Sequence, residues 1–241
     1  MSRPVVESLA WDSGFLGFPV ARLVARHLSA SALAAVVADS RGAGIRLIYL
    51  VAEPADAETA AAARQAGAWL ADQKVTFARQ TQDLTGDLVP DSTQIEIATA
   101  FTPQLERLAW QSGEFSRFRR DELFAPHVFP ALYSHWLRAS LGGELARVVL
   151  ASVPPTGAET GLLTLSEQHG RASIGLLAVA VAARGLGVGR QLVAAARQQA
   201  QQWGCAALQV VTQRANGPAC QFYTRCGFEL VREEHLYHLW L

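Results

Sequence analysis

The chain has 241 residues, half of which are hydrophobic, and its 21 basic residues balance 21 acidic ones. A chain of this length and apolar content can bury a core in one large domain or two small ones. The zero net charge excludes the broad basic surface of a non-specific nucleic-acid binder, so any anion site has to be local.

The sequence carries no signal for membrane insertion or secretion. Its longest strictly apolar run, residues 176–183, is far shorter than the roughly 20 residues that cross a bilayer, and the N-terminal stretch lacks the apolar region of a signal peptide. The three cysteines, Cys205, Cys220 and Cys226, have neither disulfide-framework nor zinc-ligand spacing. We therefore expect a soluble cytoplasmic protein with reduced cysteines, no bound metal and no membrane or nucleic-acid partner.

The first predicted elements alternate between helix and strand. Alanine-rich segments with polar starts predict helices, and runs of β-branched and aromatic residues predict strands. The expected elements are helix 30–41, strand 45–52, helix 56–66 and strand 69–78. Together they predict a small α/β unit.

The stretch from residue 80 to residue 93 is polar, contains a glycine and a proline, and has neither a helical nor a strand period. We place a domain boundary there, between an N-terminal α/β domain of residues 1–88 and a C-terminal domain of residues 89–241. In residues 65–79 a helix end, a glycine that terminates it and a strand follow one another, and the same order occurs in residues 225–239. Either the N-terminal domain is a degenerate copy of the C-terminal one, or the similarity is a coincidence that arises from a common turn.

The C-terminal domain is predicted to begin with a strand and two helices, followed by three strands and then helix, strand, helix, strand. Thr102 and Pro103 provide the cap and first-turn proline of its first helix. Three segments rich in β-formers predict an antiparallel meander. The expected elements are strand 93–98, helix 103–112, helix 128–141, strands 146–153, 160–167 and 171–181, helix 187–203, strand 206–212, helix 217–225 and strand 228–240.

A glycine-rich loop, ARGLGVGRQL at residues 183–192, joins the third meander strand to the next helix. Its alternating glycines leave N–H groups unshielded at a helix start, which favours an anion. A P-loop is excluded because Lys74 is the only lysine, and a dinucleotide fingerprint is disfavoured because Arg190 replaces the third glycine and the next strand lacks an acid. Two interpretations remain: a pyrophosphate loop formed by residues 185–190 with Arg184, or a tight turn for close helix packing.

The loop and a downstream element together resemble the GNAT superfamily of acyl-CoA-dependent N-acyltransferases. The superfamily's Arg/Gln-x-x-Gly-x-Gly/Ala loop binds the CoA pyrophosphate and is matched by Arg184, Gly187 and Gly189. Its Asn-x-x-Ala-x-x-Phe-Tyr-x-x-x-Gly-Phe element is matched by Asn216, Ala219, Phe222, Tyr223, Gly227 and Phe228. The resemblance implies an α+β fold with a mixed, largely antiparallel sheet flanked by helices, and acetyl-CoA as co-substrate.

The resemblance also implies roles for these residues. The strand Leu177–Val181 would pair with the pantetheine arm of CoA and donate N–H groups to the thioester oxygen, where it splays from strand 206–212. Tyr223 would be the general acid, because a phenol with a pKa near 10 can protonate a thiolate without ionising at pH 7; the alternative is a core aromatic residue. The residues expected to contact CoA are Leu177, Val179, Val181, Arg184, Gly185, Leu186, Gly187, Val188, Gly189, Arg190, Asn216, Ala219 and Phe222.

A narrower resemblance, to the dTDP-fucosamine acetyltransferase family, covers nearly the whole chain. It rests on ESLAWDSGFLGFPVARL, SGEFSRFRRDELF, LYSHWLRASL and QVVTQRANGPACQFYTRCGFELV. It implies acetylation of the 4-amino group of a dTDP-linked 4-amino-4,6-dideoxy sugar. Because homodimers are common in the superfamily, the resemblance also implies a homodimer.

The segment beginning at Ser116 is the candidate acceptor site. If it is extended, Arg117 and Arg119 lie on one side and can clamp the pyrophosphate of a sugar nucleotide. The alternative is a solvated stretch that pairs its arginines with nearby acids.

Two other functions remain open at this point. The acceptor could be a small amine, an amino acid or a protein N-terminus. From a different class, the chain could be a non-catalytic acyl-CoA-binding module.

Overall fold

The computed structural model describes residues 4–25, 27–82, 94–155 and 157–241. The chain divides into two compact units, one of residues 1–74 with 233–241 and one of residues 75–232. Strands β4 (Trp69–Gln80) and β10 (Glu229–Trp240) each contribute residues to both units. The expected boundary between residues 88 and 89 lies outside the described residues, so the division at that point stays a prediction.

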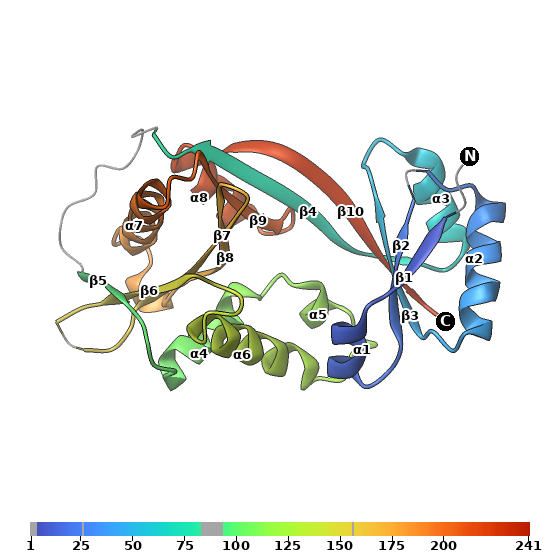
Figure 1. Ribbon diagram of the computed structural model, residues 1–241, viewed down its shortest axis with the longest axis horizontal. Coiled ribbons are helices and arrows are strands. Elements are labelled where there is room, and N and C mark those ends of the chain that lie inside the picture. The colour runs from blue at the N-terminus through green and yellow to red at the C-terminus, as the bar shows by residue number, and fades with distance from the viewer. Residues whose placement is uncertain (1–3, 26, 83–93, 156) are drawn as a thin grey trace. The chain divides into compact units, whose positions relative to one another are not determined.

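The N-terminal unit is a mixed sheet with helices α2 and α3 packed on one face (Figure 1). The strand order is β1-β2-β3-β10-β4, in which β2 and β3 are parallel while β1 pairs with β2, and β10 with β3, antiparallel. Alternate residues of β3, Ile48 and Leu50, are buried against these helices. The elements are β1 (Val5–Ser8), α1 (Ala10–Leu16), β2 (Val20–Val24), α2 (Ala30–Gly42), β3 (Leu47–Ala52) and α3 (Ala57–Gln65).

The predicted succession of helix, strand, helix and strand is confirmed for α2, β3, α3 and β4. The sequence did not predict β1, α1 and β2. Helix α1 has only seven residues, none of them buried, and no side-chain cap at Leu9. It therefore lacks both the capping residue and the apolar period by which a helix is found in a sequence.

The C-terminal unit has the strand order β5-β6-β7-β8-β9, continued by β4 and β10. Neighbouring strands from β5 to β8 are antiparallel, and β8 and β9 are parallel. The elements are β5 (Gln94–Ile97), α4 (Pro103–Ser112), α5 (Arg117–Arg120), α6 (Val128–Leu141), β6 (Val148–Val153), β7 (Gly161–Gln168), β8 (Arg171–Val179), α7 (Val188–Gln202), β9 (Ala207–Gln213) and α8 (Gly217–Arg225). This mixed, largely antiparallel sheet with flanking helices confirms the predicted fold class.

Helix α7 covers one face of this sheet, and α4 and α6 cover the other (Figure 1). On the α7 side, Leu163 and Leu165 of β7 join Leu192 of the helix in a buried apolar cluster. Gly161 is required there, because an added Cβ would lie 2.9 Å or less from carbon atoms of Val188 and Leu192. The central strands are buried on both faces, which explains why their sequences are continuously apolar.

Strand β8 carries one extra residue relative to β7. Leu165 pairs with Ile174 but Leu163 pairs with Leu177, so Gly175 and Leu176 form a β-bulge. The bulge N–H of Leu176 donates to Oγ1 of Thr164 over 2.8 Å. Residue 175 has to be small, because a Cβ there would approach Thr164 Oγ1 to 2.8 Å. A bulge bends its strand, and among the described residues the pairing of β8 with β9 ends at Ile174 and Val210.

Two local predictions were wrong. The strand expected over residues 171–181 ends at Val179, and residues 181–183 form a 3₁₀ turn after Ala180. Residues 117–120, expected to be extended, form the short helix α5. This turn begins at Ser116 because the hydroxyl of Ser116 accepts the N–H of Phe118, an N-cap bond that competes with an extended backbone.

We expect Thr164→Val to lower the free energy of unfolding by about 1–3 kcal/mol, because valine keeps the shape but removes the acceptor of a buried N–H group. Thr164→Ser keeps the hydroxyl and should lose less. Urea unfolding followed by circular dichroism measures both. Equal stability of the valine variant and the wild type would show that the hydroxyl does not support the bulge.

A second stability prediction concerns the N-terminal unit. Oγ1 of the buried Thr59 accepts the N–H of Leu28 over 2.8 Å and donates to Asp56 Oδ2 over 2.6 Å. Thr59→Val should therefore cost about 1–3 kcal/mol of unfolding free energy. The matched control, Thr224→Val at an exposed position of α8, should stay within about 0.5 kcal/mol. Similar effects of the two substitutions would contradict the prediction.

Candidate functional site

Among the described residues, the edge of β8 that faces β9 is not paired with that strand beyond Ile174. The N–H of Ala180 donates to the carbonyl of Thr160 on the β7 side over 2.8 Å. Because alternate residues of an antiparallel strand direct their backbone groups to the same neighbour, those of Leu177 and Val179 face the opposite side. Consistently, the Val179 carbonyl accepts from Gln111 Nε2 at 2.6 Å and from Arg184 Nε at 3.3 Å. This edge can pair with an extended, amide-containing molecule.

The glycine loop follows directly and ends at the start of α7. Gly185 has φ 79° and Gly187 has φ 86°, so both adopt the left-handed backbone that favours glycine. Gly187 is the N-cap of α7 and provides no side-chain cap. The first-turn N–H groups, from Val188 to Arg190, therefore have no acceptor within the helix, and a helix start of this kind favours an anion.

The side chains of the loop are mostly exposed. Val181 is 71% exposed in the 3₁₀ turn and Leu186 is 69% exposed. Arg184 and Arg190 are exposed on either side of the glycines. The predicted loop is thus present, but Val181 belongs to this turn and not to the strand in which the sequence placed it.

Helix α8 contacts both of these elements. Its cap is formed as predicted, since Asn216 Oδ1 accepts the N–H of Ala219 over 3.2 Å. An added Cβ at Gly189 would lie 3.2 Å from the ring of Phe222 and 3.6 Å from Cγ2 of Val179. The end of β8, the start of α7 and the middle of α8 therefore meet at Gly189. Three of the residues predicted to hold CoA, Val179, Gly189 and Phe222, are brought together at this point.

Tyr223 is 4% exposed and lies among aromatic rings of the same unit. Its ring centroid is 5.3 Å from that of Phe222, 5.6 Å from that of Phe228 and 6.0 Å from that of Phe77. Burial raises the pKa of Tyr223, and its electrostatic interaction with the Cys226 and Cys220 thiols, when these are ionised, raises it further. The phenol is therefore protonated at neutral pH, and burial makes it a weaker acid than an exposed tyrosine.

The candidate acceptor residues lie on α5 and are not on one side of it. Successive helical residues are about 100° apart, so Arg117 and Arg119 point in different directions. The guanidinium of Arg117 lies 4.4 Å from the ring centroid of Phe118, and that of Arg119 lies 5.1 Å from the ring centroid of Phe129. Ser116 is buried as the N-cap. Arg119 is exposed and Arg117 is partly buried, which makes Arg119 the more accessible of the two.

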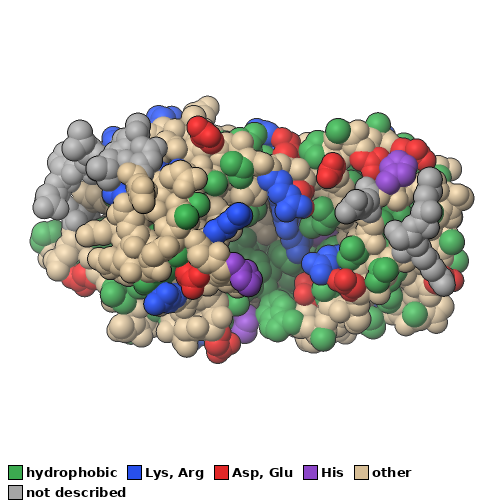
Figure 2. All heavy atoms as spheres, turned by 45° about the horizontal axis from the view of Figure 1, so that its top comes forward, with side chains coloured by type: hydrophobic (Ala, Val, Ile, Leu, Met, Phe, Trp, Pro, Cys, Tyr) green, Lys and Arg blue, Asp and Glu red, His purple; other side chains and the backbone are tan. Residues whose placement is uncertain are grey.

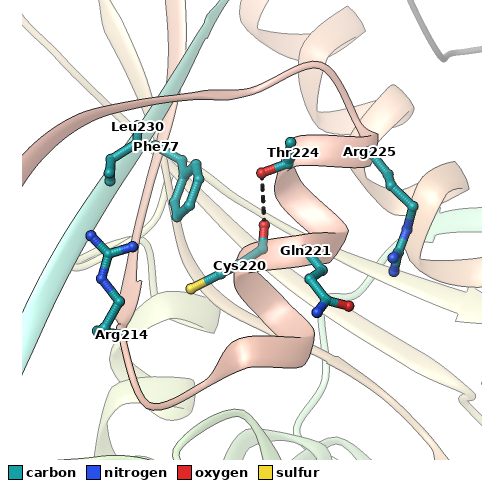
Figure 3. Close-up of a pocket in the computed structure, with 7 residues that line it drawn as sticks. All are labelled: Phe77, Arg214, Cys220, Gln221, Thr224, Arg225 and Leu230. Carbon is teal, nitrogen blue, oxygen red and sulfur yellow. Dashed lines mark hydrogen bonds between the residues drawn. The ribbon is translucent and has the colours of Figure 1, made fainter.

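A shallow depression of about 450 Å³ lies beside α8 (Figure 3). It is lined by Phe77, Arg214, Cys220, Gln221, Thr224, Arg225 and Leu230. None of these residues was predicted for the site. The residues of α8 predicted for CoA, Ala219 and Phe222, pack instead against the buried core.

Two residues at the site were not predicted from the sequence. Gln111 reaches the Val179 carbonyl from α4, and Thr164 holds the bulge from β7. Neither belongs to a recognisable motif. The contact of Gln111 depends on the packing of α4 against β8, which no local sequence pattern encodes.

Acidic and basic side chains are both spread over the face of the molecule seen in Figure 2. Within the described part of the chain, every helix is too short or too polar to cross a bilayer. No group of three or more His, Cys, Asp or Glu side chains that could hold a metal ion is found among the described residues.

Comparison with solved structures shows that the fold is shared. A functionally unknown conserved protein of Staphylococcus epidermidis superimposes with a TM-score of 0.71 at 10% identity, over 99% of this chain and 91% of the other. A tandem GNAT protein from the clavulanic acid biosynthesis pathway has a TM-score of 0.60 at 16% identity, over 92% and 75%. A GCN5-related glucosamine N-acetyltransferase region of a fungal multi-domain β-N-acetylglucosaminidase has a TM-score of 0.57 at 16% identity, over 98% of this chain and 31% of the other.

A search of curated proteins found no match to this sequence. The family model described as the acetyltransferase (GNAT) family matches residues 97–228, more than half of the chain, from the end of β5 to the residue before β10. The matched range contains the bulged strand, the glycine loop and Tyr223. The chain therefore belongs to the acetyltransferase (GNAT) family.

Proposed function

We propose that the protein transfers an acetyl group from acetyl-CoA to the amino group of a small molecule by direct attack of the amine. The observation that carries this proposal is the meeting of β8, α7 and α8 at Gly189. Near this point lie the edge of β8 beyond its pairing with β9, the start of α7 and, beside Phe222, the buried ring of Tyr223. These three groups match the amide arm, the pyrophosphate and the leaving thiolate of an acyl-CoA.

The residues fit the parts of acetyl-CoA in order along the site. The edge at Leu177 and Val179 would pair with the pantetheine amides. The N–H groups of residues 185–190 would hold the pyrophosphate, with Arg184 and Arg190 adding charge-assisted hydrogen bonds. Asn216 and Ala219, at the start of α8, would flank the arm from the other side.

The chemistry requires stabilisation of charge and one proton donation. The amine nitrogen attacks the thioester carbon, and the Leu177 N–H would donate to the oxygen on which negative charge develops. When the carbon–sulfur bond breaks, Tyr223 would give its proton to the departing thiolate, and the amine proton is lost to water. The phenolate left on Tyr223 then regains a proton, because burial makes the charged form unfavourable.

For the acceptor, we propose the 4-amino group of a dTDP-linked 4-amino-4,6-dideoxy sugar. The basic turn α5 supports this, because a nucleotide sugar brings a pyrophosphate that guanidinium groups bind well. The fungal region of the same fold is named for glucosamine, an amino sugar. Because Arg117 and Arg119 diverge, we assign the pyrophosphate contact to the exposed Arg119 and not to a symmetrical clamp.

The general test is release of free thiol from acetyl-CoA with a panel of dTDP- and UDP-linked amino sugars beside simple amines, amino acids and peptides. Turnover with a dTDP-linked amino sugar in preference to the other acceptors supports the proposal. Preference for a simple amine or peptide would overturn the acceptor assignment. Binding of CoA without thiol release from any acceptor would indicate a non-catalytic module.

Tyr223→Phe keeps the buried ring and removes only the proton donor. We expect kcat to fall by about 10²–10⁴-fold, the usual size of a general-acid contribution, while the KM for acetyl-CoA changes little. Steady-state thiol release measures both constants. The matched control, Tyr237→Phe, alters an equally buried tyrosine of the N-terminal unit and should leave kcat unchanged. An unchanged kcat in the Tyr223 variant, with chemistry limiting the rate, would remove this residue from the mechanism.

Arg119→Ala should raise the KM for the nucleotide-sugar acceptor by about 10-fold or more, the cost of a lost charge-assisted hydrogen bond, and leave that for acetyl-CoA nearly unchanged. The control is Arg171→Ala, an exposed arginine at the first residue of β8. Equal changes in both Michaelis constants would contradict the role of Arg119 in acceptor binding.

A further inference from the structure

The carbonyl of Val179, at the end of β8, accepts hydrogen bonds from two side chains. Nε2 of Gln111 donates to it over 2.6 Å, and Nε of Arg184 donates to it over 3.3 Å. The usual distance of an N–H···O bond is about 2.7–3.2 Å. The contact of Gln111 is therefore short, whereas that of Arg184 is longer than usual and is the weaker of the two.

The two side chains also differ in their freedom to leave the carbonyl. Gln111 is half-buried on α4, which packs against β8. Arg184 is exposed in the glycine loop, beside the N–H groups proposed to hold the pyrophosphate. A guanidinium prefers anionic oxygens to neutral ones and can bind a phosphate through two parallel N–H bonds. A pyrophosphate in the loop would therefore draw Arg184 away from Val179 and leave Gln111 in place.

The Val179 carbonyl lies on the edge that a bound acyl-CoA needs. Under the proposed function, on which this inference rests, the pantetheine arm lies along Leu177 and Val179. Its amide N–H groups leave water on binding and require acceptors in the protein. A carbonyl oxygen has two lone pairs, and the two side chains use both in the ligand-free protein. The arm therefore needs one donor to leave, and Arg184, which makes the weaker contact, is that donor.

We propose that Arg184 is a specificity-determining residue that occupies the Val179 carbonyl until the pyrophosphate of CoA binds its guanidinium. Binding of the pyrophosphate then frees this acceptor for the arm of the same molecule. A pantetheine thioester that lacks the nucleotide has to displace Arg184 without this exchange. The glycine loop in this way favours CoA thioesters over shorter pantetheine thioesters.

The first test uses adenosine 3′-phosphate 5′-diphosphate, which contains the nucleotide and the pyrophosphate of CoA but no arm. The ¹³C resonance of the Val179 carbonyl is recorded by NMR through the amide of Ala180, before and after saturation with this ligand. Loss of a hydrogen bond moves a carbonyl resonance upfield. We expect an upfield shift in the wild type and none in Arg184→Met, which keeps an aliphatic side chain but has no donor.

The second test is an NMR titration with pantetheine, which is the arm without the nucleotide. In Arg184→Met the arm meets no competing donor, so its Kd should fall by about 3- to 10-fold, the value of one hydrogen bond. The Kd of adenosine 3′-phosphate 5′-diphosphate should rise in the same variant, because a contact to the pyrophosphate is lost. The matched control is Arg190→Met, which removes the other exposed arginine of the glycine loop and should weaken only the nucleotide.

The same carbonyl shift in the wild type and in Arg184→Met would overturn the inference, because Arg184 would not have left the carbonyl. An unchanged or higher Kd of pantetheine in this variant would also overturn it, since a competing donor has to weaken binding of the arm. Failure of the wild type to bind CoA would instead refute the proposed function, and this result is seen before any variant is compared.

Discussion

The candidate site depends on one extra residue in β8. Without the bulge at Gly175 and Leu176, β8 and β9 would continue as a parallel pair and every backbone group between them would be used within the sheet. The hydroxyl of Thr164 accepts the N–H that the bulge leaves over, and the missing Cβ of Gly175 leaves room for that hydroxyl. The sheet thus gains an open edge in its interior without burying an unsatisfied N–H group.

The second constraint is the close packing at Gly189. A Cβ at residue 189 would lie only 3.2 Å from the ring of Phe222 and 3.6 Å from Cγ2 of Val179, so both pack closely against the backbone of Gly189. This contact fixes the start of α7 against both the strand and α8. Because the groups proposed to bind the anion are backbone N–H groups, their position is set by this packing and not by flexible side chains. A protein of zero net charge can in this way hold a strongly charged ligand at one place.

Features with a local physical cause could be predicted from the sequence. Caps such as Thr102 and Asn216, glycine stops and continuous apolar runs located most helices and strands within one or two residues. The glycine loop and Tyr223 could be proposed for the site because their spacing is fixed along one chain segment. The turn at α5 was missed because a single serine cap outweighed the extended pattern of its arginines.

Contacts between distant segments were not predictable. Gln111 and Val179 are separated by 68 positions, and Thr164 and Leu176 by 12, so both pairs depend on the completed packing of the sheet and its helices. The first strands and α1 were missed for a different reason. They are short, they bury little, and their stability comes from their neighbours and not from a pattern of their own.

The aromatic surroundings of Tyr223 also determine how the enzyme would respond to alkaline conditions. Its phenol ionises at a higher pH than that of an exposed tyrosine, so the proposed general acid stays protonated at a pH at which a substrate amine loses its proton. Under the proposed chemistry, the rate rises with pH because the acceptor amine loses its proton. Ionisation of this tyrosine does not then lower the rate within the usual working range of pH. Under the proposed function, the pH profile would report the basicity of the acceptor amine and so help to identify it.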